Sequence, residues 1–527
     1  MKKNIFKIVI TAGFLAGSFA SCTKKLDLLP TNDVTATQVY STPAGYKQAF
    51  AKVYGSFALT GNQGPAGNGD IQGIDEGTSD FLRLYWKAQE LSTDEAVVSW
   101  GDPGIQDFHN MNWSSSNPML TGLYYRAYYQ ITLCNDFINQ SSDANLASRG
   151  ISGADADAIK VYATEARFLR AFQYSVIMDL FGTGPMATEK DALGSVLPAL
   201  ATRAQLFSYI ETELKAIEGS LVAAKSNEYG RADKAAAWSL LSRIYLNAQV
   251  YTGTARWADA AIYSKKVIDA GYSLIPNYTQ LMLADNNGNT NEFILTINYD
   301  GLKTQNWGGT TFLTHAPIGG SMTASNFGVD GGWGGLRTTK NLPALFPDIT
   351  GTADKRSQFY AGGQALDIAD LTKFTDGYAV TKYRNVTKTG ANGSSLTWTD
   401  IDFPLFRLAE QYLTYAEATL RNGADATLAL TYINNLRTRA YGNTAGNIAS
   451  GQLTTDFILD ERARELYWEG FRRTDLIRYN KFVESTYLWP WKGGVKSGTS
   501  VDAYRKIYPI PSADISSNVK LVQNPGY

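Results

Sequence analysis

The chain has 527 residues, a formal net charge of −1, and a high aromatic content of 31 Tyr, 23 Phe and 11 Trp. This length can bury a large core, in one large domain or two closely joined ones. The near-neutral charge lacks the basic excess of nucleic-acid-binding domains, so we expect no nucleic acid partner. With only two histidines, a zinc centre built on histidine is also disfavoured.

The N-terminus has the pattern of a bacterial lipoprotein signal. Basic residues at Lys2, Lys3 and Lys7 precede an apolar stretch at 8–20, which is too short to span a bilayer as a helix. Small residues and then Cys22 follow. We therefore expect residues 1–21 to be a signal peptide that is removed, and Cys22 to carry the lipid. The alternative is an ordinary cleaved secretory signal followed by an incidental cysteine. If Cys22 is lipidated, Cys134 has no disulfide partner.

The remaining chain divides into a tether and one large domain. Residues 22–45, interrupted by Pro30 and Pro43, are expected to form the lipidated cysteine and an extended tether, and residues 46–527 a single α-helical domain. Two long Gly-rich segments lie in that domain, at 61–77 and at 301–335, and the second contains Trp307 and Trp333. Loops of this length are uncommon in compact domains unless they are functional or disordered. We expect the loop-rich regions at about 61–113 and 301–346 to carry the binding site.

Apolar residues recur at helical spacing in several blocks. The periodicity predicts helices over 165–181, 232–248, 257–270, 406–420, 427–440 and 455–479. The pairs 232–248 with 257–270, and 406–420 with 427–440, are each helix, short turn, helix, the pattern of tetratricopeptide-like hairpins. The predicted fold is therefore mainly α, a scaffold of such hairpins with long Gly-rich loops and little β structure.

Two charged or polar segments permit more than one interpretation. The run Asp460–Arg473 is interpreted as a solvated or fold-stabilising helix face with local pairing. The segment Asp285–Glu292 offers oxygen ligands and a turn glycine, so we consider a structural calcium ion bound at Asp285. It lacks the spacing of an EF-hand loop, and a plain polar loop is the simpler interpretation. No other cofactor is expected.

Several motifs in order along the chain resemble the SusD/RagB family. They are Gly-Arg-Ala-Asp-Lys-Ala-Ala-Ala-Trp at 230–238, the segment 459–476 with Glu-Arg-Ala-Arg-Glu-Leu and Trp-Glu-Gly-Phe, Tyr-Pro-Ile-Pro at 508–511, and Asn-Pro-Gly-Tyr at 524–527. The resemblance implies an α-helical fold with four tetratricopeptide-like hairpins and no catalysis. It also implies a lipid-anchored protein on the surface of the outer membrane that forms a lid over a TonB-dependent transporter of the SusC type.

Further segments resemble the starch-binding members of this family. They are 73–77 with Arg83, 90–95, 303–309, 374–377 and 489–494. The resemblance implies a site for starch or α-glucan (maltooligosaccharides), formed by three aromatic residues, Trp100, Trp307 and Trp333, and two polar partners, Asp75 and Arg83. Trp307 stands where those members have tyrosine, and the loop near residues 102–103 is one residue shorter here.

This set suits the chemistry of glucose polymers, because aromatic rings cover the apolar faces of sugar rings and charged side chains hydrogen-bond hydroxyls. Without the resemblance, Trp100 would be interpreted as a core residue, and Asp75 and Arg83 as a pair that orders a loop. Three alternatives stay open: a family member that binds another glycan, a transporter lid with a weak site of its own, and a surface glycosidase. Glycosidases require a pair of carboxylates, and the sequence contains no recognisable catalytic motif.

Overall fold

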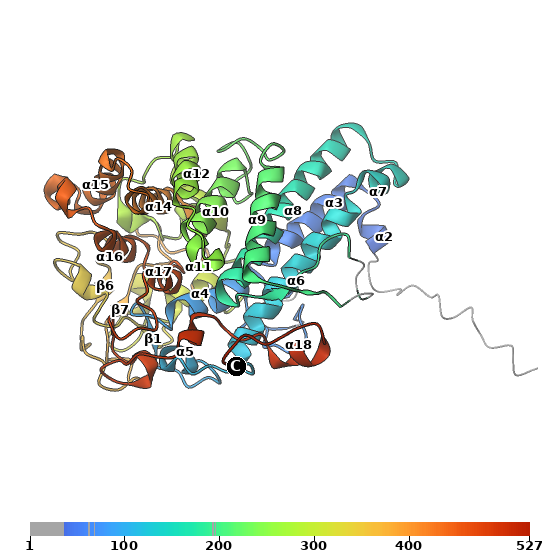
Figure 1. The fold of residues 1–527 in the computed structure, drawn as a ribbon. Coiled ribbons are helices and arrows are strands. Elements are labelled where there is room, and N and C mark those ends of the chain that lie inside the picture. The colour runs from blue at the N-terminus through green and yellow to red at the C-terminus, as the bar shows by residue number, and fades with distance from the viewer. Residues whose placement is uncertain (1–35, 62–63, 68, 192–193, 195–196) are drawn as a thin grey trace, which may run out of the picture.

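The computed structural model describes residues 36–61, 64–67, 69–191, 194 and 197–527. Cys22 and the expected signal peptide lie outside these residues. Within them the chain is mainly helical, and helices stack side by side from α2 and α7 at one end to α15 at the other (Figure 1). Long loops and short strands lie along one side of this stack (Figure 1). The predicted fold class is confirmed.

The first half of the stack, with the loops beside it, contains helices of 4 to 28 residues. In chain order these are α2 (Ala36–Val39), α3 (Pro43–Gly55), α4 (Phe81–Glu90), α5 (Asp107–Asn110), α6 (Pro118–Gln140), α7 (Asp143–Ser148), α8 (Gly153–Leu180) and α9 (Arg203–Ile217). Helix α6 packs on α8, and α8 packs on α9. The expectation of an extended tether up to residue 45 is wrong from residue 36 onward. Pro43 occupies the first turn of α3, and the Thr42 side chain accepts the N–H of Gly45; both features favour a helix start.

The second half contains the two predicted hairpins. The first comprises α10 (Lys234–Leu246), α11 (Ala248–Thr252) and α12 (Trp257–Asp269), and the second comprises α14 (Leu408–Arg421) and α15 (Thr427–Tyr441). Helix α12 packs on both α10 and α14, so the two hairpins stack although they are far apart in sequence. The block predicted at 455–479 is divided into α16 (Thr455–Leu466) and α17 (Arg472–Arg478). Between them Trp468 has a φ of 64°, in the left-handed region.

In the described residues the β-strands form four two-stranded antiparallel pairs. They are β1 (Val97–Val98) with β5 (Leu336–Arg337), β2 (Gly184–Pro185) with β3 (Leu200–Ala201), β4 (Phe293–Ile297) with β8 (Phe403–Arg407), and β6 (Phe359–Tyr360) with β7 (Ala379–Val380). In the first pair Val97 lies opposite Arg337 and Val98 opposite Leu336. Two short helices complete the fold, α13 (Gly309–His315) and α18 (Ser512–Ser517). The β1–β5 pair joins two loop regions that are widely separated in sequence.

A buried network of charges, the ion network, joins α16 to the strands and loops around it. Its members are Glu292, Asp354, Arg356, Lys382, Arg407, Arg437, Arg439, Glu461, Arg464, Glu465 and Glu469. Arg407 lies at its centre, with Nη1 3.0 Å from Glu292 and 2.7 Å from Glu465. Burial would raise the pKa of Glu465, but Arg439, Arg407 and Arg356 lower it to about 2. The charged run at 460–473 therefore stabilises the fold, whereas the expectation that it is a solvated face with mainly local pairing is wrong.

The segment considered for calcium is a short 3₁₀ turn with most of its polar groups engaged by protein. Asp285 Oδ1 accepts the backbone N–H of Lys388 at 3.1 Å, and Asn286 is buried with its amide donating to two carbonyl oxygens. The Glu292 carboxylate belongs to the ion network. Among the described residues no group of three or more His, Cys, Asp or Glu side chains could hold a metal ion. A calcium ion at Asp285 stays a prediction that none of these contacts supports.

Candidate functional site

Four tryptophans from four separate loops lie next to one another, and we call them the tryptophan cluster. Trp398 lies 4.3 Å from Trp307 between ring centroids, Trp307 lies 6.1 Å from Trp333, and Trp333 lies 6.3 Å from Trp100. All four side chains are half-buried. Neighbouring rings are tilted by 47° to 58° relative to each other. The cluster therefore presents several ring surfaces that face in different directions.

The β1–β5 pair holds Trp100 against Trp333. Ser99 extends the pair, since its N–H donates to the carbonyl of Gly335 at 2.9 Å and its hydroxyl donates to the carbonyl of Gly334 at 2.8 Å. The indole N–H of Trp100 donates to the carbonyl of Trp333 at 3.2 Å. A Cβ at position 335 would lie only 2.1 Å from Trp100 Cε2, so only glycine allows this close approach.

His315, at the end of α13, connects the loops that carry Trp333 and Trp398. Its Nδ1 lies 2.6 Å from the carbonyl oxygen of Gly331, and its Nε2 lies 3.1 Å from that of Thr397. The imidazole stacks on Trp333 with 5.1 Å between centroids, and burial lowers the pKa of His315. One buried side chain thus positions the loops that carry Trp333 and Trp398.

Arg83, on α4, lies at the base of the cluster. Its guanidinium donates to the carbonyl of Trp307 at 2.7 Å, and its Cζ is 4.7 Å from the ring centroid of Phe312 and 5.8 Å from that of Trp333. Burial lowers the pKa of Arg83 to about 10. Asp75 is exposed and accepts the N–H of Thr78 at 3.0 Å. In the part of the chain that the structure describes, no ion pair joins Asp75 to Arg83, so a simple loop-ordering pair does not explain them.

A pocket of about 440 Å³, which we call the side pocket, opens beside the cluster. Its charged lining comes from three places: Asp75 in one loop, Arg83 and Lys87 on α4, and Asp102, two residues after Trp100. Thr121 on α6 closes another side, together with apolar atoms of Met119. Arg83 contacts the cluster and also lines the side pocket, so the two lie next to each other.

The structure brings together all five residues that the resemblance implied. Trp100, Trp307 and Trp333 belong to the cluster, Arg83 lies at its base, and Asp75 lies at the edge of the side pocket. Trp398 was missed. The signal for it was nevertheless present, because Trp398 is a lone tryptophan in a segment, 387–400, rich in Gly, Ser and Thr. The same reasoning that selected Trp307 and Trp333 applies to it.

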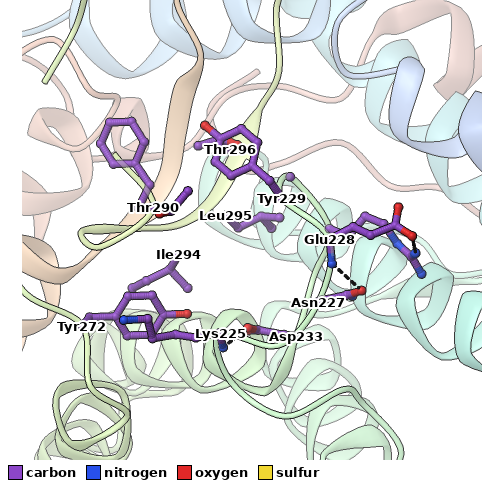
Figure 2. Close-up of a pocket in the computed structure, with 13 residues that line it drawn as sticks. Lys225, Asn227, Glu228, Tyr229, Asp233, Tyr272, Thr290, Ile294, Leu295 and Thr296 are labelled. Carbon is purple, nitrogen blue, oxygen red and sulfur yellow. Dashed lines mark hydrogen bonds and ion pairs between the residues drawn. The ribbon is translucent and has the colours of Figure 1, made fainter. Parts of the chain in front are cut away.

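A second pocket, of about 160 Å³, lies at the family motif that begins at Gly230 (Figure 2). Its polar side chains mainly contact protein. The Asp233 carboxylate accepts the backbone N–H of Lys225 at 2.7 Å and caps the first turn of α10 through Ala235 at 2.8 Å. Arg231 pairs with the buried Glu165. This motif therefore fixes the start of α10, and it has a structural role apart from the tryptophan cluster.

The chain is similar to known proteins in sequence and in structure. The model of the SusD family matches residues 355–527. The starch-binding protein SusD of Bacteroides thetaiotaomicron is 35% identical, and the match covers 100% of this chain and 99% of that protein. The chain belongs to the SusD family. SusD-like protein P2 of Formosa agariphila is 24% identical over 81% of this chain and 85% of its own length.

Solved structures of SusD relatives share the fold. Surface glycan-binding protein A from Bacteroides thetaiotaomicron, in complex with laminarihexaose, superposes with a TM-score of 0.68 at 22% identity, covering 91% of this chain and 99% of that one. A SusD superfamily protein from Parabacteroides distasonis gives a TM-score of 0.71 at 20% identity, covering 94% and 100%. At these identities the likeness concerns the fold alone. Across the described residues, none of the helices has the length and apolar character needed to cross a membrane.

Proposed function

We propose that this SusD-family chain binds starch or a related α-glucan at the cell surface and delivers it to a TonB-dependent transporter of the SusC type. The observation that carries the binding proposal is the tryptophan cluster with Arg83 at its base. Full-length similarity to a relative named as starch-binding supports the choice of glycan.

The geometry of the cluster favours a curved glycan over a flat one. Aromatic rings stack on the apolar faces of sugar rings, and successive glucose units of an α-glucan turn relative to one another. Rings tilted by 47° to 58° can follow such a turn, whereas an extended flat chain is better matched by coplanar rings. Arg83 and Asp75 then supply a donor and an acceptor for the fringe of hydroxyls.

Calorimetric titration with maltoheptaose tests the binding proposal. Saturable heat with maltoheptaose and none with a cellooligosaccharide of equal length is the expected result. Trp307→Ala should weaken binding by about 1–3 kcal/mol, by analogy with stacked bases, without lowering the melting temperature. No heat with any α-glucan would refute the starch assignment. The chain would then be a family member that binds another glycan. Steady release of reducing ends from amylopectin would instead indicate a glycosidase.

The membrane anchor and the transporter are separate parts of the proposal. We propose that Cys22 is lipidated, which the sequence pattern around it supports, and that residues 1–21 are removed. Metabolic labelling with a fatty-acid probe should label the wild type and leave Cys22→Ser unlabelled. Pull-down through the tagged chain should recover a TonB-dependent barrel. The transporter-lid alternative would be favoured if the Trp307→Ala variant still recovers the barrel and still supports glycan uptake.

A further inference from the structure

We infer that the side pocket is a second subsite, which binds one neutral sugar unit that branches from the glycan chain stacked on the tryptophan cluster. The inference rests on the proposed function and names the substrate class more closely, as a branched α-glucan. It is carried by two buried cations that form no ion pair within the described residues, by their position in a pocket, and by the contact of one of them, Arg83, with the cluster.

The floor of the side pocket carries two cationic side chains one helical turn apart on α4. Lys87 is 1% exposed and Arg83 is 7% exposed, and across the described chain neither forms an ion pair. Among the residues that the structure describes, the ammonium of Lys87 donates only to the thioether of Met119, at 3.5 Å, and a thioether is a weak acceptor. The Nε of Arg83 has no hydrogen-bond partner in the described part of the chain.

Such groups are costly to bury. A cation removed from water without compensating contacts destabilises the fold, and buried polar groups are normally satisfied by a partner. Burial, followed by the charge of Arg83, holds the pKa of Lys87 well below its usual value. A ligand that brings oxygen atoms into the pocket would supply the missing acceptors. The unsatisfied donors therefore point to a bound oxygen-rich group.

The rest of the lining identifies that group as a sugar unit without charge. Asp75 and Asp102 are exposed at the edge of the pocket and supply acceptors opposite the donors of Arg83 and Lys87. A hydroxyl both donates and accepts, so a sugar ring can use both kinds of group, whereas an anion would meet two carboxylates on entry. Pro103, Pro118 and Met119 provide apolar contact, and the volume falls in the range of small-ligand pockets.

The position of the pocket makes this unit a branch. Arg83 contributes to both parts of the site: its guanidinium contacts the cluster and it also lines the pocket. Asp102 follows Trp100 by two residues, and a Cβ at Gly77 would lie 3.8 Å from Trp307 and 3.2 Å from Asp75. A glycan chain on the tryptophans thus passes the mouth of the pocket. A unit that enters the pocket must leave the line of the stacked chain.

Cyclodextrins test the inference, because a cyclic glucan has no chain end that could enter the pocket. We compare the Kd for β-cyclodextrin with that for 6-O-α-glucosyl-β-cyclodextrin by calorimetry. The wild type should bind the branched ring at least about fivefold more tightly, the gain expected from one net hydrogen bond. In Lys87→Met the ratio of the two Kd values should fall to about one. The matched control Lys265→Met, on α12, should keep the wild-type ratio.

The remaining outcomes test the branch subsite and the proposed function separately. Thr121→Phe should fill the pocket and abolish the preference, which provides a second variant if Lys87→Met does not fold. Equal Kd values for the two rings in the wild type would overturn the branch subsite while leaving the proposed function intact. No binding of either ring, together with no heat from maltoheptaose, would refute the proposed function itself. Tighter binding of a phosphorylated β-cyclodextrin than of the glucosylated one would overturn the assignment to a neutral unit.

Discussion

Trp398 offers a sharp test of the proposed site, because no part of the family resemblance pointed to it. Its ring lies 4.3 Å from Trp307 at an angle of 56°. Trp100 and Trp333 pack against the main hydrophobic core, whereas the rings of Trp307 and Trp398 lie outside it. Trp398→Ala should therefore change glycan binding with little effect on folding.

The size of the effect follows from two contributions. Losing one stacked ring costs about 1–3 kcal/mol, which raises Kd by roughly 5- to 150-fold. Aromatic pairs are also coupled by about 0.5–1.5 kcal/mol, because each ring holds the other in place. The double variant Trp307→Ala with Trp398→Ala should thus lose less than the sum of the two single losses, by about that coupling.

Titration with maltoheptaose and a thermal melt on each variant measure both contributions. Trp398→Phe retains a ring and should bind within about fivefold of the wild type, a loss near 1 kcal/mol. Trp238→Ala on α10 removes a half-buried tryptophan outside the cluster and should leave Kd unchanged. An unchanged Kd in Trp398→Ala, or an equal loss in Trp238→Ala, would refute the reasoning.

Three further predictions concern packing and charge. Gly335→Ala should weaken glycan binding, because its Cβ would lie 2.1 Å from Trp100 Cε2, whereas Gly331→Ala, whose Cβ meets nothing within 4 Å, should leave Kd unchanged. Arg407→Leu leaves three buried carboxylates short of a cation and should lower the free energy of unfolding in urea by about 3–5 kcal/mol; a loss below about 1 kcal/mol would contradict this estimate. Burial raises the pKa of Glu95 to about 8, above the value of about 4.3 expected in the unfolded chain. Protonation of Glu95 therefore favours the folded state. This contribution to stability is complete below about pH 4.3 and is lost as the pH rises through 8. The difference in unfolding free energy between pH 5 and pH 9 should therefore be smaller in Glu95→Gln, and an equal difference would argue against a protonated Glu95.

Local patterns in the sequence predicted the C-terminal part of α8 and the hairpin helices from α10 onward, whereas α3, α4, α6 and α9 were not predicted. Apolar spacing located the hairpin helices at 232–248 with 257–270, and the fold confirms them as α10 and α12. No helix was predicted at 43–55, because Pro43 was interpreted as interrupting any helical period. In the structure it occupies the first turn, where a missing N–H costs nothing. A proline argues against a helix only in its interior.

Long-range contacts explain what could not be predicted. Nothing near Glu465 in sequence shows that its partners are Arg407 and Arg439, so the charged run was predicted to pair locally, on a solvated or fold-stabilising helix face. The loop of Trp398 likewise reaches the cluster only through contacts such as that of Thr397 with His315. Lone tryptophans in Gly-rich loops could be selected as exposed ligand contacts. Which of them meet depends on the tertiary structure.

The ion network has a consequence for the order in which the chain assembles. Its charges come from β8, α15, α16, the residue just before β4, and the loops at 354–356, 382 and 469. A partly assembled state that dehydrated Glu292 or Glu465 before Arg407 arrived would carry an unpaired charge in an apolar setting, which is strongly unfavourable. These segments should therefore dock in a single cooperative step late in folding. Their amides should exchange with solvent deuterium together, as one unit, and separate exchange of α15 and β4 would contradict that order.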